Sequence, residues 1–584
     1  MKKLLSGNEA VARGFFEAGG HVATAYPGTP STEILENMVK YKEDVYCQWS
    51  PNEKVALEVG IGSSFGGGRT LVAMKHVGVN VAADPLMTVT YSGIKGGFLL
   101  ACADDPGMHS SQNEQDNRFY AKFAKMPLLE PSDSQEAKDF VKKGLEISEE
   151  YDTPVLLRLT TRISHTKTLV EFKDREENND LIGFEKNPSK YVMVPANGRK
   201  RHPIVEKRTK KLKDLAESID INFAEMNETE MGIITSGIAY QYVKEAFPKA
   251  SVLKLGMAFP FPINKVKEFS KKVEKLYVVE ELEPFMEEII KSEGIEVIGK
   301  DLIPRCGELN TSIVKKSILK NKNESEDNQF EDVEMPVRPP VLCPGCPHRG
   351  VFYTLNKLNA VVTGDIGCYT LGVQKPLSAM DSTIAMGAAI GVNIGLEKVL
   401  GKEFSRKSVA VIGDSTFLHS GTTGLMDAVY NKGTNTILIL DNRITAMTGR
   451  QDNPATGYNL MGEETKQVDF VKLSKALGVE RVQIVDPYDL EELKNVISEE
   501  MSREEVSVII TKRPCMLIRR MEYDIKKYRV DEDKCINCGL CLKVGCPAVI
   551  KNDDETKAKI VESLCTGCSV CAQVCPKDAI EIVE

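Results

Sequence analysis

Residues 408–442 read SVAVIGDSTFLHSGTTGLMDAVYNKGTNTILILDN and contain two short apolar runs, 409–412 and 437–440. Runs of this kind are typical of strands that are buried on both faces of a sheet. The 24 residues that separate them are enough for the crossover that two parallel strands need, since a crossover takes about a dozen residues or more. The stretch therefore predicts a parallel sheet. The polar residues that follow each run are expected at one edge of it, where open α/β sheets bind ligands.

The same alternation of apolar runs and amphipathic stretches extends in both directions along the chain. It predicts an α/β protein with two doubly wound domains, a small α/β domain and a cysteine-rich tail. Strands are expected at 21–25, 70–74, 97–102, 154–159, 231–235, 251–256, 275–280, 360–363 and 506–511, and helices at 31–40, 52–66 and 134–149. The predicted boundaries are 1–171 and 341–524 for the doubly wound domains, 172–229 for a polar linker or surface excursion, 230–315 for the small domain, 316–340 for an acidic linker and 525–584 for the tail.

Charge and composition exclude several classes of partner. The 584 residues include 75 basic and 84 acidic side chains, for a net charge of −9, and no basic run stands out. We therefore expect no nucleic-acid partner. The apolar stretch at the N-terminus is too short for a signal peptide. No segment approaches the roughly 18 uninterrupted apolar residues that a membrane-spanning helix needs. These features predict a cytoplasmic protein with no membrane partner.

Eight of the 15 cysteines lie between Cys535 and Cys575, in two related runs. The second run, C-x2-C-x2-C-x3-C-P, is the run of bacterial ferredoxins, and the first has one more residue before its last cysteine. In such runs the last cysteine ligates the other cluster. We therefore expect a ferredoxin-like module with two [4Fe-4S] clusters. The predicted ligands are Cys535, Cys538, Cys541 and Cys575 for the first cluster, and Cys565, Cys568, Cys571 and Cys546 for the second. The alternative is a pair of structural zinc sites, which do not call for triple runs followed by Cys-Pro.

The polar residues after the two apolar runs resemble the GDG…N signature of thiamine diphosphate enzymes, with Ser415 in place of the last glycine. Mg²⁺ on the diphosphate prefers oxygen ligands, which Asp414 and Asn442 can supply. The resemblance adds the carbonyl of Ile444 as a third ligand, and Gly413 would let the backbone approach the phosphates. The alternative is an ordinary strand-to-helix turn.

A second part of the signature lies in the first domain. Residues 52–56, NEKVA, resemble the helix start that carries the essential glutamate of thiamine diphosphate enzymes. The resemblance implies that Glu53 hydrogen-bonds the aminopyrimidine ring of the cofactor. The alternative is a carboxylate that is favoured at a helix start by the helix dipole. Because the two parts occur on separate α/β domains in the order this enzyme class uses, we predict thiamine diphosphate with Mg²⁺ as a cofactor.

Two further motifs resemble those of 2-oxoacid:ferredoxin oxidoreductases. Residues 26–33, YPGTPSTE, are similar to a segment in which the threonine, here Thr29, contacts the substrate, although the same residues also suit a stiff turn before a helix. Residues 343–349, CPGCPHR, and 364–368, GDIGC, resemble the start of the thiamine-binding domain. This second likeness implies that His348, Asp365 and Gly367 contact the cofactor.

The order of domains, together with the stretches 75–85 and 441–451, resembles the large (α) subunits of indolepyruvate:ferredoxin oxidoreductases. The resemblance implies oxidative decarboxylation of an aryl pyruvate with coenzyme A, giving the aryl-acetyl-CoA and CO₂, with electrons passing to ferredoxin. It also implies a smaller β subunit as partner. The alternatives are the same reaction on another 2-oxo acid, such as phenylpyruvate or a branched-chain acid, and a non-redox thiamine decarboxylase with a fused electron carrier.

Two sets of residues remain open at this point. His109 and Arg118 lie in a polar loop after an expected strand and are candidate catalytic residues of the substrate pocket, although polar loop residues are more often only solvated. Four other cysteines occur where related β chains bind a cluster beside the cofactor: Cys343, Cys346, Cys368 and Cys515. The alternative is that these are loop and core cysteines without a metal.

Overall fold

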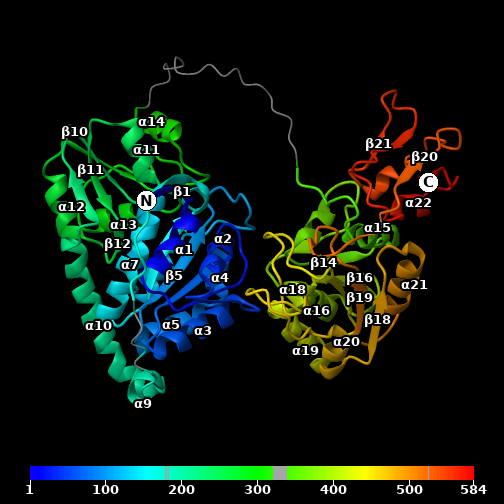
Figure 1. Ribbon diagram of the computed structural model, residues 1–584, viewed down its shortest axis with the longest axis horizontal. Coiled ribbons are helices and arrows are strands. Elements are labelled where there is room, and N and C mark those ends of the chain that lie inside the picture. Colours follow the sequence, from blue (N-terminus) through cyan, green and yellow to red (C-terminus); the bar gives the residue numbers. More distant parts are fainter. Residues whose placement is uncertain (178–180, 182, 320–338, 524, 584) are drawn as a thin grey trace. The chain divides into compact units, whose positions relative to one another are not determined.

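The computed structural model describes residues 1–177, 181, 183–319, 339–523 and 525–583, and divides into two compact units, Met1–Val333 and Glu334–Glu584 (Figure 1). Most of the predicted linker 316–340 lies outside the described residues. No helix among the described residues is long and apolar enough to cross a membrane.

The first unit is built on a seven-stranded sheet in the order β12-β6-β7-β5-β4-β2-β3. All neighbours pair in parallel except β12 and β6. The strands are β2 (Val22–Ala25), β3 (Tyr46–Trp49), β4 (Thr70–Lys75), β5 (Phe98–Asp104), β6 (Leu128–Leu129), β7 (Val155–Thr160) and β12 (Met257–Phe259). β4, β5 and β7 are buried along their whole length, as the apolar runs predict.

Helices cover both faces of this sheet. α3 (Glu53–Phe65) packs so closely that a Cβ on its Gly60 would lie 3.2 Å from the ring of Phe98. α7 (Ser134–Tyr151) brings Gly144 against the next residue of β5, Leu99, where a Cβ would lie 2.6 Å from the side chain. Successive residues of a strand point to opposite faces, so the two helices lie on opposite sides. The domain is doubly wound, as predicted.

A smaller sheet in the same unit has the order β13-β10-β11-β9. Its strands are β9 (Asn222–Glu225), β10 (Glu228–Thr235), β11 (Ala250–Leu255) and β13 (Lys275–Val279), and its helices are α11 (Ala239–Ala246), α12 (Ile263–Ser270), α13 (Phe285–Ser292) and α14 (Thr311–Leu319). The strand β12 leaves this segment and pairs with β6 of the large sheet. The small α/β segment is therefore joined to the first domain through a shared sheet.

Residues 172–229, predicted as a polar linker or excursion, contain α9 (Pro188–Tyr191) and the 24-residue helix α10 (Pro195–Ser218). The buried positions of α10 recur every three or four residues and are Arg201, Val205, Arg208, Leu212 and Ala216. The two arginines donate to backbone carbonyls, Arg201 to Tyr91 and Arg208 to Asp152. The helical pattern is hidden in the sequence because two of its inward positions are charged.

The second unit contains a six-stranded sheet, all parallel, in the order β15-β14-β16-β17-β19-β18. Its strands are β14 (Val361–Gly364), β15 (Ser382–Thr383), β16 (Ser408–Gly413), β17 (Thr436–Asp441), β18 (Arg481–Val485) and β19 (Ser507–Lys512). α15 (His348–Leu358) and α21 (Leu490–Met501) pack over one face. α16 (Ala388–Leu400), α19 (Thr422–Tyr430) and α20 (Phe470–Ala476) pack over the other. This domain is also doubly wound.

The cysteine-rich tail forms a small module with two antiparallel strand pairs, β20 (Tyr528–Val530) with β23 (Ile580–Ile582) and β21 (Val549–Lys551) with β22 (Ala558–Ile560). A 3-10 turn η4 (Leu542–Val544) and the short helix α22 (Val570–Gln573) lie within the two cysteine runs, each just before the last cysteine of its run. Few apolar residues are fully buried in this module, and the cysteines themselves fill much of its interior.

Candidate functional site

Asp414 and Asn442 lie side by side at the carboxyl edge of the sheet in the second unit. Asp414 follows β16 and Asn442 follows β17, and the strands pair through Gly413 and Leu440. Both side chains are buried. The edge predicted from residues 408–442 is therefore present, and it brings together the two side chains that were expected to bind Mg²⁺.

The carboxylate of Asp414 is only half satisfied by the protein. Its Oδ1 accepts a hydrogen bond from the Ser415 backbone N–H at 2.6 Å, whereas Oδ2 is buried and has no hydrogen-bond partner among the described residues. Burial, with a contribution from the neighbouring Asp441, raises the pKa of Asp414 to about 8. A divalent cation would compensate both features, because it takes an oxygen ligand and favours the charged form. The residues present thus fit Mg²⁺.

The side chain of Asn442 is held in one orientation. Its Oδ1 accepts from the backbone N–H of Ile444 at 3.1 Å, and its Nδ2 lies 3.2 Å from Nε2 of His348. His348 is the first residue of α15, and burial lowers its pKa to about 4. The imidazole is therefore neutral at pH 7 and can accept from the Asn442 amide, which leaves Oδ1 directed toward Ile444.

Two glycines at this edge close around a tyrosine that the sequence reasoning missed. A Cβ on Gly367 would lie 2.3 Å from the ring of Tyr369, and one on Gly413 would lie 2.6 Å from the same ring. The Tyr369 hydroxyl donates to the Ile366 carbonyl at 3.1 Å. Asp365, the residue after β14, accepts from the backbone N–H groups of Ile366 and Gly387, and burial raises its pKa to about 7. Asp365 and Gly367 thus belong to the same edge as Asp414.

In the first unit, Glu53 is the first residue of α3 and is 4% exposed. The preceding Asn52 caps the helix by accepting from the Val55 N–H at 2.9 Å. A Cβ on Gly78 would lie 2.7 Å from Oε1 of Glu53, so the glycine leaves the room that the carboxylate occupies. A carboxylate that only stabilises a helix start needs neither burial nor such a space, so the surroundings favour a specific role for Glu53.

Thr29 lies at the same edge of the first sheet. Its carbonyl accepts from the hydroxyl of Ser110 at 3.2 Å, and the ammonium of Lys75 donates to the Ser110 carbonyl at 2.7 Å. Loops that follow β2, β4 and β5 thus meet here. Burial lowers the pKa of Lys75 to about 8. Sequence reasoning missed Lys75, although its position at the end of an apolar run was a usable signal.

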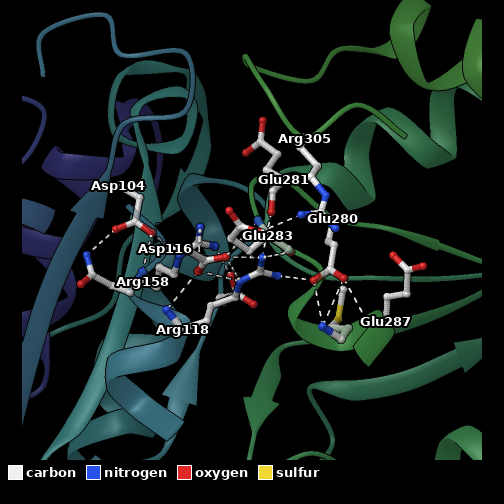
Figure 2. Close-up of polar contacts among 12 residues, drawn as sticks. Asp104, Asp116, Arg118, Arg158, Glu280, Glu281, Glu283, Glu287 and Arg305 are labelled. Atoms are coloured by element: carbon white, nitrogen blue, oxygen red, sulfur yellow. Dashed lines mark hydrogen bonds and ion pairs between the residues drawn. The ribbon is translucent and has the colours of Figure 1, made fainter. Parts of the chain in front are cut away.

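The two loop candidates, His109 and Arg118, are placed differently from Thr29. His109 is half exposed, and its Nε2 lies 3.6 Å from the carboxylate of Glu308. Arg118 is 1% exposed and forms ion pairs at 2.5 Å with Asp116 and Glu280 (Figure 2). Each nitrogen of its guanidinium donates to a protein acceptor, among them the carbonyl of Glu281 at 2.8 Å. This placement gives Arg118 a structural role and argues against the predicted contact with substrate.

Arg118 belongs to a buried network of charges (Figure 2). Arg158 of β7 pairs with Asp104 at 2.6 Å and with Glu130, and lies 3.7 Å from Asp116. Burial raises the pKa of Glu281, in the loop after β13, to about 7. The network links the end of the large sheet to the small α/β segment.

The cysteines of the tail lie close to one another. A small cavity is lined by Cys535, Cys538, Cys541 and Cys575. Burial raises the pKa of Cys571, and the neighbouring thiols Cys568, Cys546, Cys565 and Cys541 contribute to the rise. No three His, Cys, Asp or Glu side chains in the described parts of the chain are placed to hold a single metal ion.

The remaining four candidate cysteines also lie near one another. Burial, with smaller contributions from Cys368 and Cys515, raises the pKa of Cys346 to about 12. Burial also raises the pKa of Cys368, with smaller contributions from Cys515 and Cys343. The backbone N–H of Cys515 donates to the Asn442 carbonyl at 2.9 Å, so this set adjoins the Asp414 edge.

Comparison with protein families matches three parts of the chain. Residues 13–231 match "Pyruvate flavodoxin/ferredoxin oxidoreductase, thiamine diP-bdg", residues 365–511 match "Thiamine pyrophosphate enzyme, C-terminal TPP binding domain", and residues 528–582 match "4Fe-4S dicluster domain". These matches confirm the α/β fold class with its ferredoxin-like tail, and thiamine diphosphate and iron–sulfur clusters as cofactors. The chain is an enzyme of the iron–sulfur-linked 2-oxoacid oxidoreductases.

Similar curated proteins cover the whole chain. The indolepyruvate oxidoreductase subunit IorA of Archaeoglobus fulgidus is 42% identical, over 99% of this chain and 97% of its own length. The IorA subunit of Pyrococcus abyssi is 43% identical, over 100% of this chain and 97% of its own length. The solved 2-oxoglutarate:ferredoxin oxidoreductase of Magnetococcus marinus covers 55% of this chain and 65% of its own at 17% identity, with a TM-score of 0.46, which is too low to add to the assignment. The two full-length relatives decide it: the chain belongs to the family of the IorA subunit of indolepyruvate oxidoreductase.

Proposed function

We propose that this chain oxidatively decarboxylates aryl pyruvates, indolepyruvate foremost. One 2-oxo acid and one coenzyme A give one aryl-acetyl-CoA, CO₂ and a proton, and two electrons pass through [4Fe-4S] clusters to two molecules of ferredoxin. The names of the full-length relatives support this substrate. The structural observation that carries the proposal is that the Asp414–Asn442 edge and the cluster cysteines belong to one compact unit, with Cys515 bonded to Asn442.

In this proposal Mg²⁺ is held by Asp414, Asn442 and the carbonyl of Ile444. When bound, thiamine diphosphate supplies an electron sink for the loss of CO₂. Asp414 contributes the negative charge, and His348 keeps the Asn442 amide in its ligating orientation. Glu53 holds and exchanges a proton at the aminopyrimidine ring, and Thr29 is retained as the residue that contacts the substrate. His109 stays a candidate at the edge of the substrate pocket, whereas Arg118 is not assigned a catalytic role.

For electron transfer we propose two clusters in the tail, one bound by Cys535, Cys538, Cys541 and Cys575 and the other by Cys565, Cys568, Cys571 and Cys546. The proximity of Cys343, Cys346, Cys368 and Cys515 supports a third cluster beside the Asp414 edge. A smaller β subunit is proposed as the partner that completes the enzyme.

A substrate panel on the purified complex with the β subunit tests the proposal. Anaerobic reduction of a viologen dye is measured with indolepyruvate, phenylpyruvate, pyruvate and a branched-chain 2-oxo acid, each with and without coenzyme A. We expect the highest kcat/KM with indolepyruvate and a strict requirement for coenzyme A. Preference for a branched-chain acid would refute the substrate assignment. Release of CO₂ without dye reduction would indicate a non-redox decarboxylase instead.

A further inference from the structure

Arg349, the second residue of α15, lies between two groups of cysteines in the second unit. Its guanidinium is 2% exposed. Nη2 donates to the carbonyls of Leu342 at 2.5 Å and Cys343 at 3.2 Å. Nη1 donates to the carbonyls of Val544 at 3.2 Å and Gly545, which immediately precede Cys546. One side chain thus joins the loop of Cys343 to the loop of Cys546.

The Arg349 guanidinium is held by backbone carbonyls and is paired with no carboxylate among the residues that the structure describes. Its Nε is buried without an acceptor among the same residues. Burying a charge is costly unless it is paired. The four carbonyls solvate the cation through their dipoles, but they do not neutralise it. A negative group that the bare chain lacks would compensate the charge.

Thiols lie on both sides of Arg349, because one loop that it bonds contains Cys343 and the other continues into Cys546. The Arg349 cation also acts electrostatically on Cys568 and Cys346. Two further contacts hold the same junction together: the Tyr488 hydroxyl donates to the Gly345 carbonyl at 2.5 Å, and Thr566 packs against Gly345. The arginine is therefore positioned to act on the cluster that Cys546 and Cys568 would bind.

We propose that Arg349 is a positioning and tuning residue that raises the reduction potential of the cluster held by Cys546, Cys565, Cys568 and Cys571. This inference rests on the cluster ligands proposed above. A one-electron reduction adds one negative charge to a cluster, and a buried cation beside it stabilises the reduced state, because net charge and solvent exposure set cluster potentials. On the side of the other cluster, Lys557 bonds to the Cys535 carbonyl but is partly exposed, so water screens its charge.

The consequence is an ordering of the two clusters. The Cys568 cluster, which lies on the Arg349 side, becomes the better electron acceptor. The Cys535 cluster becomes the stronger reductant of the two. A tenfold preference for the electron on the first cluster corresponds to about 59 mV for a one-electron couple.

The test is an anaerobic redox titration of the whole complex, followed by electron paramagnetic resonance, for wild type, Arg349→Met and Arg349→Lys. Signals are assigned with Cys571→Ser, which removes a ligand of one cluster only. Arg513→Met is the matched control, because Arg513 also lies near Cys568 but pairs with Asp486 at 2.8 Å. Iron content is measured in every sample.

We expect Arg349→Met to lower the midpoint potential of the Cys568 cluster by at least about 59 mV, the equivalent of a tenfold change. The midpoint potential of the other cluster should stay unchanged. Arg349→Lys keeps the charge, so its Cys568 cluster should have a midpoint potential close to that of the wild type. Arg513→Met should change neither potential. Unchanged potentials at normal iron content overturn the inference while leaving the proposed function intact. Equal loss of iron from both Arg349 variants also overturns it, since that outcome assigns the arginine a purely structural role. Absence of iron in the wild type would instead refute the clusters of the proposed function.

Discussion

At the scale of single residues, Asp414 combines an unsatisfied buried oxygen with a raised pKa, and both features predict how it binds metal. A carboxylate must lose its proton to ligate a cation. Because the pKa of Asp414 is about 8, retention of thiamine diphosphate with Mg²⁺ is expected to weaken as the pH falls below that value. Asp441→Asn removes a neighbouring negative charge, which lowers the pKa of Asp414 and moves this loss to lower pH.

Calorimetric titration of Mg²⁺ and thiamine diphosphate between pH 6 and 9 measures both effects. Asp414→Ala is expected to abolish retention of the cofactor while iron content stays at the wild-type value. Normal cofactor binding by Asp414→Ala would show that the metal ligand lies elsewhere.

For Glu53 we predict an effect on turnover instead of on cofactor binding, because its proposed role is to exchange a proton during the reaction. Glu53→Gln keeps the shape and a hydrogen-bonding group, so cofactor affinity should stay within a few-fold of wild type. Turnover should fall by roughly 10²–10⁴-fold, the usual loss when a general acid–base group is removed, with little change in KM. Steady-state dye reduction by the complex measures both quantities.

The matched control is Glu58→Gln on the same helix α3. Glu58 is exposed and pairs with Lys54, so its loss should leave turnover unchanged. If Glu58→Gln were inactive and Glu53→Gln active, the wrong glutamate would have been identified. If both variants were active, the proposal that the first unit activates the cofactor would be refuted.

At the scale of elements, the fully buried strands were predictable and the charged elements were not. β4, β5, β16 and β17 follow apolar runs, since burial on both faces leaves no polar positions. The two-residue β6 carries too little pattern to stand out. The site shows the same division: residues after apolar runs, such as Asp414, were predictable, whereas Tyr369 is defined by its packing against two glycines that are distant in sequence.

The buried network around Arg118 yields a prediction at this scale, because it joins β7 and α6 (Arg118–Ala124) to the loop after β13 (Figure 2). Arg118→Met leaves Asp116 and Glu280 buried without their partner, and breaking a buried ion pair in this way costs about 3–5 kcal/mol. Denaturant unfolding followed by circular dichroism measures the change. Arg305→Met is the control, since its pair with Glu283 at 3.7 Å is exposed and is worth under about 1 kcal/mol. Full stability of Arg118→Met combined with a large rise in KM would restore Arg118 as a substrate contact.

At the scale of the whole molecule, the proposed function assigns decarboxylation to the α/β domains and electron transfer to the tail clusters, and Cys571→Ser tests this assignment. The substitution removes one thiolate of one cluster, so iron per chain should fall by that cluster's share and dye reduction should collapse. Release of ¹⁴CO₂ from labelled substrate in a single turnover should persist, because the α/β domains keep their residues. Unchanged iron would refute the ligand assignment, and stoichiometric zinc in the wild type would replace the cluster assignment entirely.

The order of the two thiamine-type domains and the cysteine-rich tail was the most predictable feature at this scale, because each of these three carries its own motif. The join between the first domain and the small α/β segment was not, since β12 crosses into the large sheet without any local signal in its three residues. The likeness to the IorA subunits follows from motif order and is confirmed by identity over the full length.

The interior of the tail module has a consequence for the life of the protein in a cell. Its few buried apolar side chains surround cysteines, so little hydrophobic free energy remains to hold the module without its clusters. Acquisition of iron and sulfide and folding of the tail then become one event, in which metal affinity is converted into fold stability. Oxidative damage to a cluster would expose backbone to proteases as well as interrupt electron flow. The amount of active enzyme would therefore follow the supply of iron and the absence of oxygen, even at constant synthesis.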